Sequence, residues 1–239
     1  MITEDNVAEY VASTCDRLVG PALVAIYDGR KGSSAPFQSG TGFIVRRGDQ
    51  NVLVTAHHCL FGKDPDKPEN PGDKGVFVDG LLRPLGEVAL TKCAHDRHHD
   101  VAVVCVDRFE NALPETAMAA HHEHTPVVTV HGFLSRDFRR TRTGPGVLRP
   151  KPFIFQQPGN KVDDGFLKFE FPRKGRLTRS QKPAMSPIPR GLSGSPILDS
   201  LALVKGMVGV AGVFTDWHEG VGKGATRLVI SAAVDQLFD

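Results

Sequence analysis

Short hydrophobic runs recur along the whole chain and are separated by polar, glycine-rich or proline-rich segments. Runs of this length that are rich in valine, isoleucine and phenylalanine are typical of strands. In the first half of the chain, the pattern predicts strands at residues 22–27, 41–45, 52–55, 76–78, 88–90 and 101–106. In the second half, it predicts strands at residues 126–133, 153–155, 166–171, 208–214 and 227–230. The chain is therefore expected to be an all-β protein.

Two of these runs indicate which faces of their strands are buried and which are exposed to solvent. Residues 101–106 are all hydrophobic, as expected of a strand that is buried on both faces. Asp100 stands at the start of this strand, where its carboxylate would be partly desolvated and a histidine N–H would be a suitable partner. Residues 166–171 alternate between hydrophobic and polar side chains, which predicts one buried and one solvated face.

Helices are expected near the two ends of the chain. Residues 3–5 combine a capping hydroxyl with acids in the first turn, and a hydrophobic stripe follows as far as Leu18. We expect this helix to brace a β-barrel, and we expect residues 231–238 to form a closing helix. The looser pattern at residues 110–124 is interpreted as a linker. The predicted parts are an N-terminal helical segment (1–20), a first β-barrel (21–112) and a second β-barrel (113–239).

Composition excludes several classes of partner. The 239 residues carry a formal net charge of +2, which gives no indication of nucleic acid or of a membrane surface. The first residues are acidic and polar, unlike a secretory signal, so a cytoplasmic protein is expected. No hydrophobic stretch is long enough for a transmembrane helix. The four cysteines, at 15, 59, 93 and 105, lack CxxC spacing and indicate neither a zinc site nor a disulfide framework.

Ser193 is the strongest candidate for chemistry, because it lies in a glycine-rich segment directly before a hydrophobic run. Gly191 and Gly194 allow a sharp turn, in which the N–H groups of Gly191 and Ser193 could converge on a developing oxyanion. Such a motif also occurs in ordinary turns. His58, which follows the strand at 52–55, and Asp100 favour a catalytic role for Ser193. A histidine that is oriented by a carboxylate can activate a serine.

The chain order histidine, aspartate, serine resembles that of the trypsin-like (chymotrypsin-fold) serine proteases, and the chain is most similar to stand-alone bacterial and HtrA-type protease domains without a PDZ domain. The resemblance covers nearly the whole chain. The matching segments are residues 40–45, 53–59, 100–104, 191–196 and 207–210. The resemblance implies two antiparallel six-stranded β-barrels, a cleft between them that holds the active site, and no cofactor or metal.

The same resemblance implies a role for each candidate residue. His58 would be the general base, Asp100 the carboxylate that orients it, and Ser193 the nucleophile of a serine endopeptidase. The backbone N–H groups of Gly191 and Ser193 would form the oxyanion hole. The substrate would be a protein or peptide, and small enzymes of this kind suggest limited proteolysis of specific partner proteins in the cytosol.

Several positions depart from the family pattern. His57 replaces the small residue that normally precedes the histidine, and we expect its ring to point away from Asp100 because successive strand residues face opposite ways. Leu192 stands where secreted zymogens carry an acid, so activation by N-terminal cleavage is not expected. The loop at 173–190 then becomes the candidate regulator, and we hypothesise that it switches between disordered and ordered states and that a partner acts on it. Cys59 has no cysteine just upstream to pair with and is expected to be free and buried.

The resemblance also assigns a substrate pocket. Pro187 occupies the position that holds an acid in trypsin, so a preference for arginine or lysine is not supported. The far wall resembles Gly212, Val213 and Phe214, where a bulky phenylalanine would narrow the pocket and favour small or medium apolar side chains. Asp216 or Glu219 could still supply a negative charge from the next loop.

Other features and functions were weighed beside this interpretation. The histidines at 95, 98, 99, 121, 122 and 124 lack a complete ligand pattern, so no metal site is expected. The basic residues within 136–151 are interpreted as a solvated loop, with docking of an acidic partner as the alternative. The chain could also be a catalytically silent binding module on the protease fold, if His57 or the loop before Ser193 disrupts the site. A viral polyprotein-processing protease is the third alternative.

Overall fold

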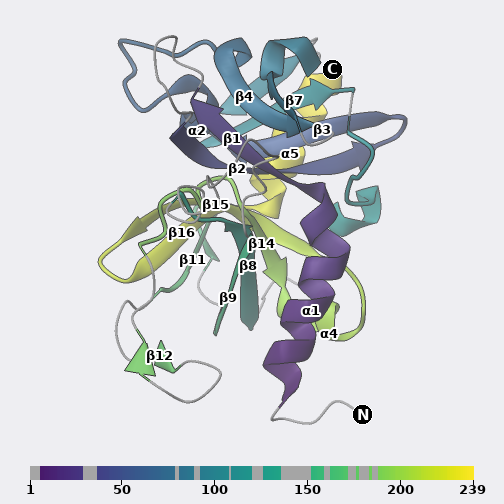
Figure 1. The fold of residues 1–239 in the computed structure, drawn as a ribbon, viewed down its shortest axis with the longest axis vertical. Coiled ribbons are helices and arrows are strands. Elements are labelled where there is room, and N and C mark those ends of the chain that lie inside the picture. The colour runs from purple at the N-terminus through teal and green to yellow at the C-terminus, as the bar shows by residue number, and fades with distance from the viewer. Residues whose placement is uncertain are drawn as a thin grey trace.

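Two antiparallel sheets make up the two halves of the molecule in the computed structural model (Figure 1). The structure describes residues 6–28, 37–78, 81–88, 92–107, 109–119, 126–135, 152–158, 162–171, 176–177, 183–184 and 188–239. The strand order is β5-β4-β1-β2-β3-β7-β6 in the first sheet and β10-β11-β16-β15-β14-β8-β9 in the second. The all-β expectation is confirmed, and so is the two-barrel, chymotrypsin-like arrangement.

The first sheet comprises β1 (Leu23–Asp28), β2 (Phe37–Arg47), β3 (Gln50–Ala56), β4 (Lys74–Val78), β5 (Leu81–Pro84), β6 (Cys93–Asp96) and β7 (Val101–Val106). Every residue of β7 is buried, as its uninterrupted hydrophobic run predicts, because this strand lies between β3 and β6 and has both faces covered. In the register of β3 and β7, Ala56 pairs with Val101. The segments that follow β3 and precede β7 therefore lie side by side.

The second sheet comprises β8 (Val127–Phe133), β9 (Pro152–Pro158), β10 (Val162–Asp163), β11 (Phe166–Glu170), β14 (Pro196–Asp199), β15 (Val210–His218) and β16 (Val221–Thr226). A separate two-stranded sheet contains β12 (Arg176–Leu177) and β13 (Pro183–Ala184). Aromatic side chains fill the core of the second sheet. Phe155 and Phe171 stack with ring centroids 4.1 Å apart, and Phe214 lies beside them.

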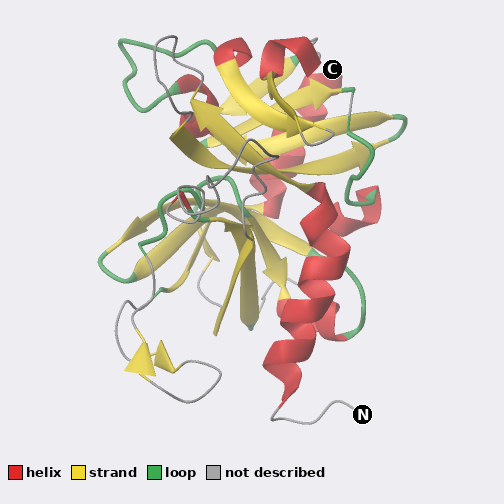
Figure 2. Ribbon diagram, viewed as in Figure 1, coloured by secondary structure: helices red, strands yellow, loops and turns green. Residues whose placement is uncertain are grey.

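The helices lie outside the sheets (Figure 2). They are α1 (Val7–Val19), α2 (His57–Phe61), α4 (Ser200–Val204) and α5 (Arg227–Phe238), with short 3-10 turns η2 (Gly20–Ala22), η3 (Pro71–Asp73), η4 (Leu85–Val88) and η5 (Glu115–Met118). Helix α1 packs against α4, β8 and β9, so it braces the second sheet. Helix α5 contacts β6 and β7 in the first sheet and β15 and β16 in the second. It therefore ties the two halves together.

Two strand predictions were wrong. Residues 227–230 begin α5, and the strand at this place is β16, whose glycines weaken the hydrophobic pattern. A Cβ atom at Gly224 would lie 2.3 Å from the Ile197 side chain, so the close packing of β16 requires glycine and hides the strand from a pattern search. Val88, expected in a strand at 88–90, ends the 3-10 turn η4, and residues 89–91 lie outside the described part.

Each sheet contains seven strands, one more than the six expected for each barrel. The short strands explain the difference. Strand β10 has two residues, too few to form a pattern, and β5 includes an arginine and a proline. The first sheet ends in sequence with β7 and the second begins with β8, while the expected boundaries at 1–20, 21–112 and 113–239 stay a prediction.

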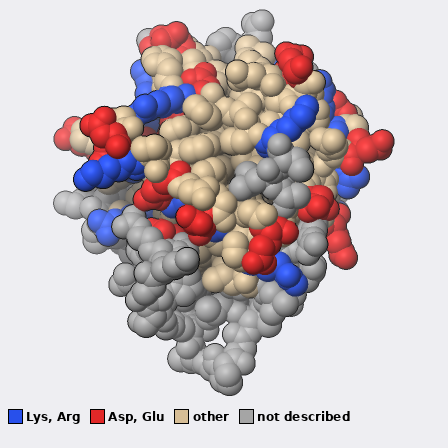
Figure 3. Space-filling model, turned by 90° about the horizontal axis from the view of Figure 1, so that it is seen from above, with Lys and Arg blue, Asp and Glu red and all other residues tan. Residues whose placement is uncertain are grey.

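Acidic and basic side chains are intermixed on the face shown in Figure 3, which agrees with the nearly balanced net charge. On that face the described residues form no large area of one sign. Among the helices that the structure describes, none combines the length and hydrophobicity that crossing a bilayer would take.

Candidate active site

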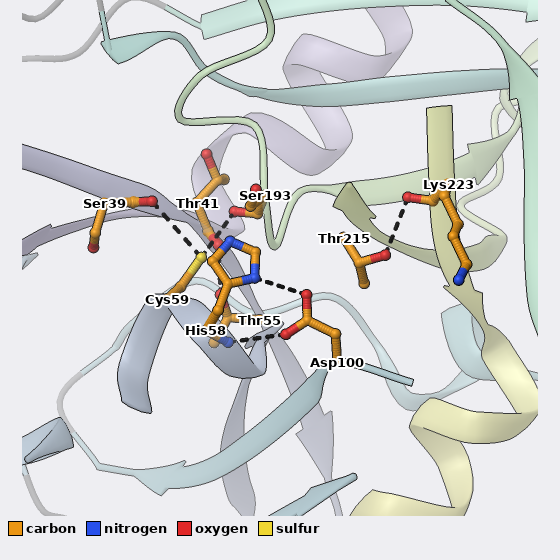
Figure 4. A network of polar contacts seen from close by, with 9 residues as sticks. All are labelled: Ser39, Thr41, Thr55, His58, Cys59, Asp100, Ser193, Thr215 and Lys223. Atoms are coloured by element: carbon orange, nitrogen blue, oxygen red, sulfur yellow. Dashed lines mark hydrogen bonds and ion pairs between the residues drawn. The ribbon is translucent and has the colours of Figure 1, made fainter. Parts of the chain in front are cut away.

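His58 and Asp100 meet because the paired strands β3 and β7 bring their adjoining segments together. His58 lies in the first turn of α2, directly after β3, and Asp100 directly precedes β7. The Nδ1 atom of His58 donates to Oδ2 of Asp100 at 2.7 Å, and the backbone N–H of His58 donates to Oδ1 at 2.9 Å (Figure 4). This two-point contact places the hydrogen on Nδ1 and leaves Nε2 as the acceptor of a neutral ring.

Asp100 adopts a backbone conformation that is rare for a residue with a side chain. Its φ angle is +58°, in the left-handed region. The backbone N–H of His57 donates to the carbonyl oxygen of Asp100 at 2.9 Å, in addition to the two hydrogen bonds from His58. Strained conformations of this kind persist where surrounding contacts hold them and are concentrated at functional sites.

The pKa of His58 reflects opposing influences. Burial of the ring lowers this pKa, but the neighbouring Cys59 and the hydrogen bond to Asp100 raise it more, so that it lies above the ordinary value for histidine. Cys59 is free and buried, as expected, and its sulfur lies 3.5 Å from the carbonyl oxygen of Ser193. The candidate base is thus enclosed by the acid on one side and by the thiol on the other (Figure 4).

The ring of His57 points away from Asp100, but not for the reason that strand alternation gives. Both histidines belong to the first turn of α2 rather than to β3. The His57 ring stacks on Phe61 with centroids 4.7 Å apart and lies 5.0 Å from the ring of His95. Burial and the nearby His95 lower the pKa of His57. His58 alone of the two contacts the Asp100 carboxylate.

Ser193 lies in the turn that leads into β14 and is attached to the first sheet through its backbone. Its carbonyl oxygen accepts a hydrogen bond from the N–H of Thr41 at 2.8 Å. In Figure 4, the His58 ring lies between Asp100 and Ser193. No hydrogen bond within the described residues joins the Ser193 hydroxyl to the His58 ring, and contacts of this kind often tighten only when substrate binds.

Carbonyl groups in the turn around Ser193 are anchored, and each anchored carbonyl orients the N–H group of the same peptide. The Arg190 carbonyl, in the peptide of the Gly191 N–H, accepts from the N–H of Ser135 at 2.9 Å. The Leu192 carbonyl, in the peptide of the Ser193 N–H, accepts from the N–H of Ser195 at 2.8 Å, and the Gly191 carbonyl between them accepts from the Thr41 hydroxyl at 2.7 Å. In a trans peptide the N–H points opposite to the carbonyl, so the Gly191 N–H faces away from Ser135. Within the described part of the chain, neither this N–H nor that of Ser193 donates a hydrogen bond.

Gln38 adds a further contact to the same turn. Its side-chain nitrogen, buried on β2, lies 3.4 Å from the Gly191 carbonyl and 3.0 Å from that of Phe133. Gly191 itself has a φ angle of +92°, which only glycine adopts readily. The turn can therefore present two N–H groups to a negative oxygen, which is what an oxyanion hole requires. Sequence reasoning missed the supporting roles of Gln38 and Thr41, because both depend on contacts between the two sheets.

A cavity of about 520 Å³ opens beside His58 and Asp100. Its walls come from α2 and the loop after it, from the turn between β6 and β7, and from β15 and β16. The residues of β15 that line this cavity are Thr215 and Asp216.

Three of the expected pocket residues, Gly212, Val213 and Phe214, do not line this cavity. Val213 and Phe214 are fully buried, and the ring of Phe214 packs against Phe169 at a centroid distance of 5.9 Å. Gly212 faces the backbone of β16, because a Cβ atom there would lie 2.3 Å from the Ala225 carbonyl oxygen. A register shift between Phe214 and Asp216, which residue spacing does not reveal, brings Thr215 and Asp216 to the cavity. Pro187 lies outside the described residues.

Within the described residues, no group of three or more histidine, cysteine or carboxylate side chains could hold a metal ion. The histidines at 121, 122 and 124 and the basic stretch at 136–151 lie outside this part of the chain. The loop at 173–190 is described only at 176–177, 183–184 and 188–190. Its expected order-disorder switch therefore stays a prediction.

Comparison with known families and structures agrees with this architecture. The family model for the trypsin-like peptidase domain matches residues 40–207. Comparison with the sequences of curated proteins gives no match. Among solved structures, the serine endoprotease from Yersinia pestis is 17% identical, with a TM-score of 0.58, and the alignment covers 99% of this chain and 67% of that chain.

Two further structures have a similar fold. Human heparin binding protein is 16% identical, with a TM-score of 0.55 and coverage of 91% of each chain. The serine protease of a human pathogenic astrovirus is 16% identical, with a TM-score of 0.50 and coverage of 86% of this chain and 89% of that chain. At such identities these matches concern the fold alone.

Proposed function

Because the chain belongs to the trypsin-like peptidase family, we propose that it is a serine endopeptidase in which Ser193, His58 and Asp100 form the catalytic triad. The Ser193 hydroxyl oxygen attacks the carbonyl carbon of a peptide bond, and its proton passes to Nε2 of His58. His58 then gives this proton to the departing amine, which leaves an acyl-enzyme. Water, deprotonated by the same histidine, hydrolyses the acyl-enzyme and restores the serine.

Asp100 holds the imidazole in the tautomer that the first step needs. Its carboxylate accepts the Nδ1 hydrogen and stabilises the ring while it is positively charged. The second hydrogen bond, from the backbone N–H of His58, prevents the carboxylate from rotating. The observation that carries the proposal is this two-point contact beside Ser193.

The tetrahedral intermediate carries a negative oxygen that must be stabilised. We assign this task to the N–H groups of Gly191 and Ser193, and the anchored carbonyls of Arg190 and Leu192, which belong to the same two peptides, support the assignment. One donor of this kind contributes about 10²- to 10³-fold to the rate in related chemistry. A substrate side chain would occupy the cavity beside His58, where Thr215 and Asp216 would contact it.

The substrate is a protein or peptide. We infer limited proteolysis of specific partner proteins in the cytosol, and a regulatory partner that acts on the loop before Ser193. In this proposal Thr215 and Asp216 take the place of Gly212, Val213 and Phe214 in the pocket, because Thr215 and Asp216 line the cavity. The assignment of Pro187 stays a prediction.

Labelling with a fluorophosphonate probe tests the nucleophile, because the probe reacts covalently with an activated serine. The wild-type protein should be labelled, Ser193→Ala should not, and Ser195→Ala should be labelled like wild type. Ser195 is a suitable control because it lies two residues away and is fully buried. Equal labelling of the wild type and Ser193→Ala would contradict the proposal.

One observation favours a catalytically silent binding module instead. The Ser193 hydroxyl makes no hydrogen bond to His58 within the described residues, although both are in the same site. If the folded wild-type protein resists the probe across the neutral and alkaline pH range, the binding module becomes the better interpretation.

A further inference from the structure

A second histidine and aspartate, His99 and Asp96, repeat the geometry of the first pair. Asp96 is the last residue of β6, and His99 lies in the turn between β6 and β7 that also carries Asp100. The Nδ1 atom of His99 lies 2.6 Å from Oδ2 of Asp96, and the backbone N–H of His99 donates to Oδ1 at 3.0 Å. The proposed mechanism uses neither residue.

The other nitrogen of His99 reaches the second sheet. Its Nε2 atom lies 3.2 Å from the carbonyl oxygen of Asp164, in the turn between β10 and β11. Asp164 and Gly165 have φ angles of +47° and +74°, as in the tight hairpin turns that favour Asp-Gly. A Cβ atom at Gly165 would lie 2.6 Å from Nε2 of His99, so the approach of the ring requires glycine. Phe166 packs beside the His99 ring with centroids 4.9 Å apart.

Both ring nitrogens of His99 therefore face oxygen atoms that only accept hydrogen bonds. A carboxylate and a backbone carbonyl have no hydrogen to donate, so both contacts are hydrogen bonds only when each ring nitrogen carries one. The Asp96 carboxylate favours this arrangement. Burial opposes ionisation of Asp96, but hydrogen bonds from His99 outweigh it and lower the pKa of Asp96.

The contact connects the two halves of the proposed active site. On one side, His99 directly precedes Asp100, whose strained backbone depends on its surroundings. On the other side, the Gly165 carbonyl accepts from the N–H of Thr226 at 2.8 Å, which ties the hairpin to the end of β16. Strand β16 pairs with β15, which lies next to the strand that follows Ser193.

We propose that His99 is a positioning residue that joins the turn holding Asp100 to the sheet holding Ser193, through a ring that donates one hydrogen bond to the Asp96 carboxylate and one to the Asp164 carbonyl. The proposal rests on the proposed serine endopeptidase function. Loss of this contact would let the Asp100 turn move relative to Ser193, and small displacements of catalytic groups are costly.

Gly165→Ala is the most selective test, because it forces the His99 ring away from the hairpin without changing either residue of the pair. Gly206→Ala is its matched control, since Gly206 has the same φ angle of +74° but nothing within 4 Å of an added Cβ. With a fluorophosphonate probe, Gly165→Ala and His99→Gln should lower the maximal inactivation rate roughly tenfold and leave the probe's half-saturation concentration unchanged. Gly206→Ala should match wild type in both quantities.

Nuclear magnetic resonance gives a readout that does not depend on activity. In the ¹⁵N-histidine-labelled wild-type protein at neutral pH, both nitrogens of His99 should show bound hydrogens. The signal of the His58 Nδ1 hydrogen, which reports the contact with Asp100, should move in Gly165→Ala and His99→Gln but not in Gly206→Ala. A His99 ring with one bare nitrogen, or an unchanged His58 signal in both variants, would overturn the positioning role even if the protein reacts with the probe. If the wild type fails to react but these signals behave as described, the endopeptidase proposal is contradicted and the contact between the sheets is supported.

Discussion

The two histidine–aspartate pairs share their geometry on one side of the ring and differ on the other. Asp100 and Asp96 each accept one hydrogen bond from a backbone N–H and one from Nδ1, with distances that agree within 0.1 Å. The Nε2 atom of His58 faces the side of Ser193, whereas that of His99 meets a backbone carbonyl. A carboxylate partner therefore does not identify a general base by itself. The group that faces the second nitrogen decides whether the ring can take up a proton.

The first test of this comparison replaces each acid in turn. Asp100→Asn should lower the rate of fluorophosphonate labelling about 10⁴-fold, because the amide favours the wrong tautomer of His58. Asp96→Asn should lower it roughly tenfold, since it disturbs only the position of the neighbouring turn. Thermal unfolding of both variants gives the control for correct folding. Equal losses in the two folded variants would show that the pairs are not distinct.

The second test concerns the site that only the His58 pair adjoins. Thr41→Val removes the hydroxyl that anchors the Gly191 carbonyl and should lower the maximal labelling rate about 10²-fold, as expected when an oxyanion donor is misplaced. Thr41→Ser keeps the hydroxyl and should retain most of the rate. Thr129→Val is the matched control, because Thr129 is equally buried and its hydroxyl contacts Ser200 at the start of α4 instead of the turn before Ser193. A comparable loss in Thr129→Val would attribute the effect to general destabilisation.

A third histidine sharpens the comparison, because it lies near a carboxylate without a hydrogen bond to it. The Nε2 atom of His131 is 3.7 Å from Asp16, while its Nδ1 atom lies 3.3 Å from the sulfur of Cys15. Burial lowers the pKa of His131 to about 4, against 6.5 for an exposed ring. Because the folded state disfavours its protonated form, stability is fully present above pH 6.5 and is lost as the pH falls towards 4.

The expected loss is roughly 3 kcal/mol of unfolding free energy between pH 7 and pH 4 from this residue. Urea unfolding of the wild type and of His131→Gln at a series of pH values measures it. The free-energy difference between the two proteins should shrink as the pH falls. A constant difference across this range would show that His131 does not titrate as a buried neutral group.

The smallest expected effect concerns the pH at which labelling begins. His58 must be neutral to accept the serine proton, so the rate should rise with pH as His58 loses its proton, above the ordinary value for histidine. Cys59→Ala removes one influence that raises the pKa of His58 and should move the rise to lower pH by a fraction of a unit. His99→Gln should lower the rate without moving the profile. An unchanged profile in Cys59→Ala would assign the raised pKa to Asp100 alone.

Features carried by local sequence were accessible before the structure. The hydrophobic run of β7 predicted a strand buried on both faces, and the resemblance of two short motifs to the protease family placed His58 and Asp100 in one site, where the structure brings them together. Both inferences depend on short segments, whereas the pairing of β3 with β7 that joins the two residues was seen only in the structure. The all-β class was confirmed for the same reason.

Features that depend on strand register or on contacts between distant turns could not be predicted from the sequence. The register shift after Phe214 moved the cavity wall to Thr215 and Asp216, and no spacing in the sequence signals such a shift. The contact of His99 with the Asp164 turn joins residues far apart in the chain. An Asp-Gly hairpin signal and an aspartate three residues before a histidine were both present, but nothing in the sequence relates one to the other.

The division of the site between the sheets also has a consequence for biosynthesis. The acid and the base belong to the half of the chain that a ribosome makes first, whereas the hydroxyl enters only with the segment after Arg190. A nascent chain that has reached β11 thus contains the proposed acid and base but not the proposed nucleophile. If Ser193 is the nucleophile, translation order alone keeps the emerging polypeptide from cutting its neighbours until β14 has been made.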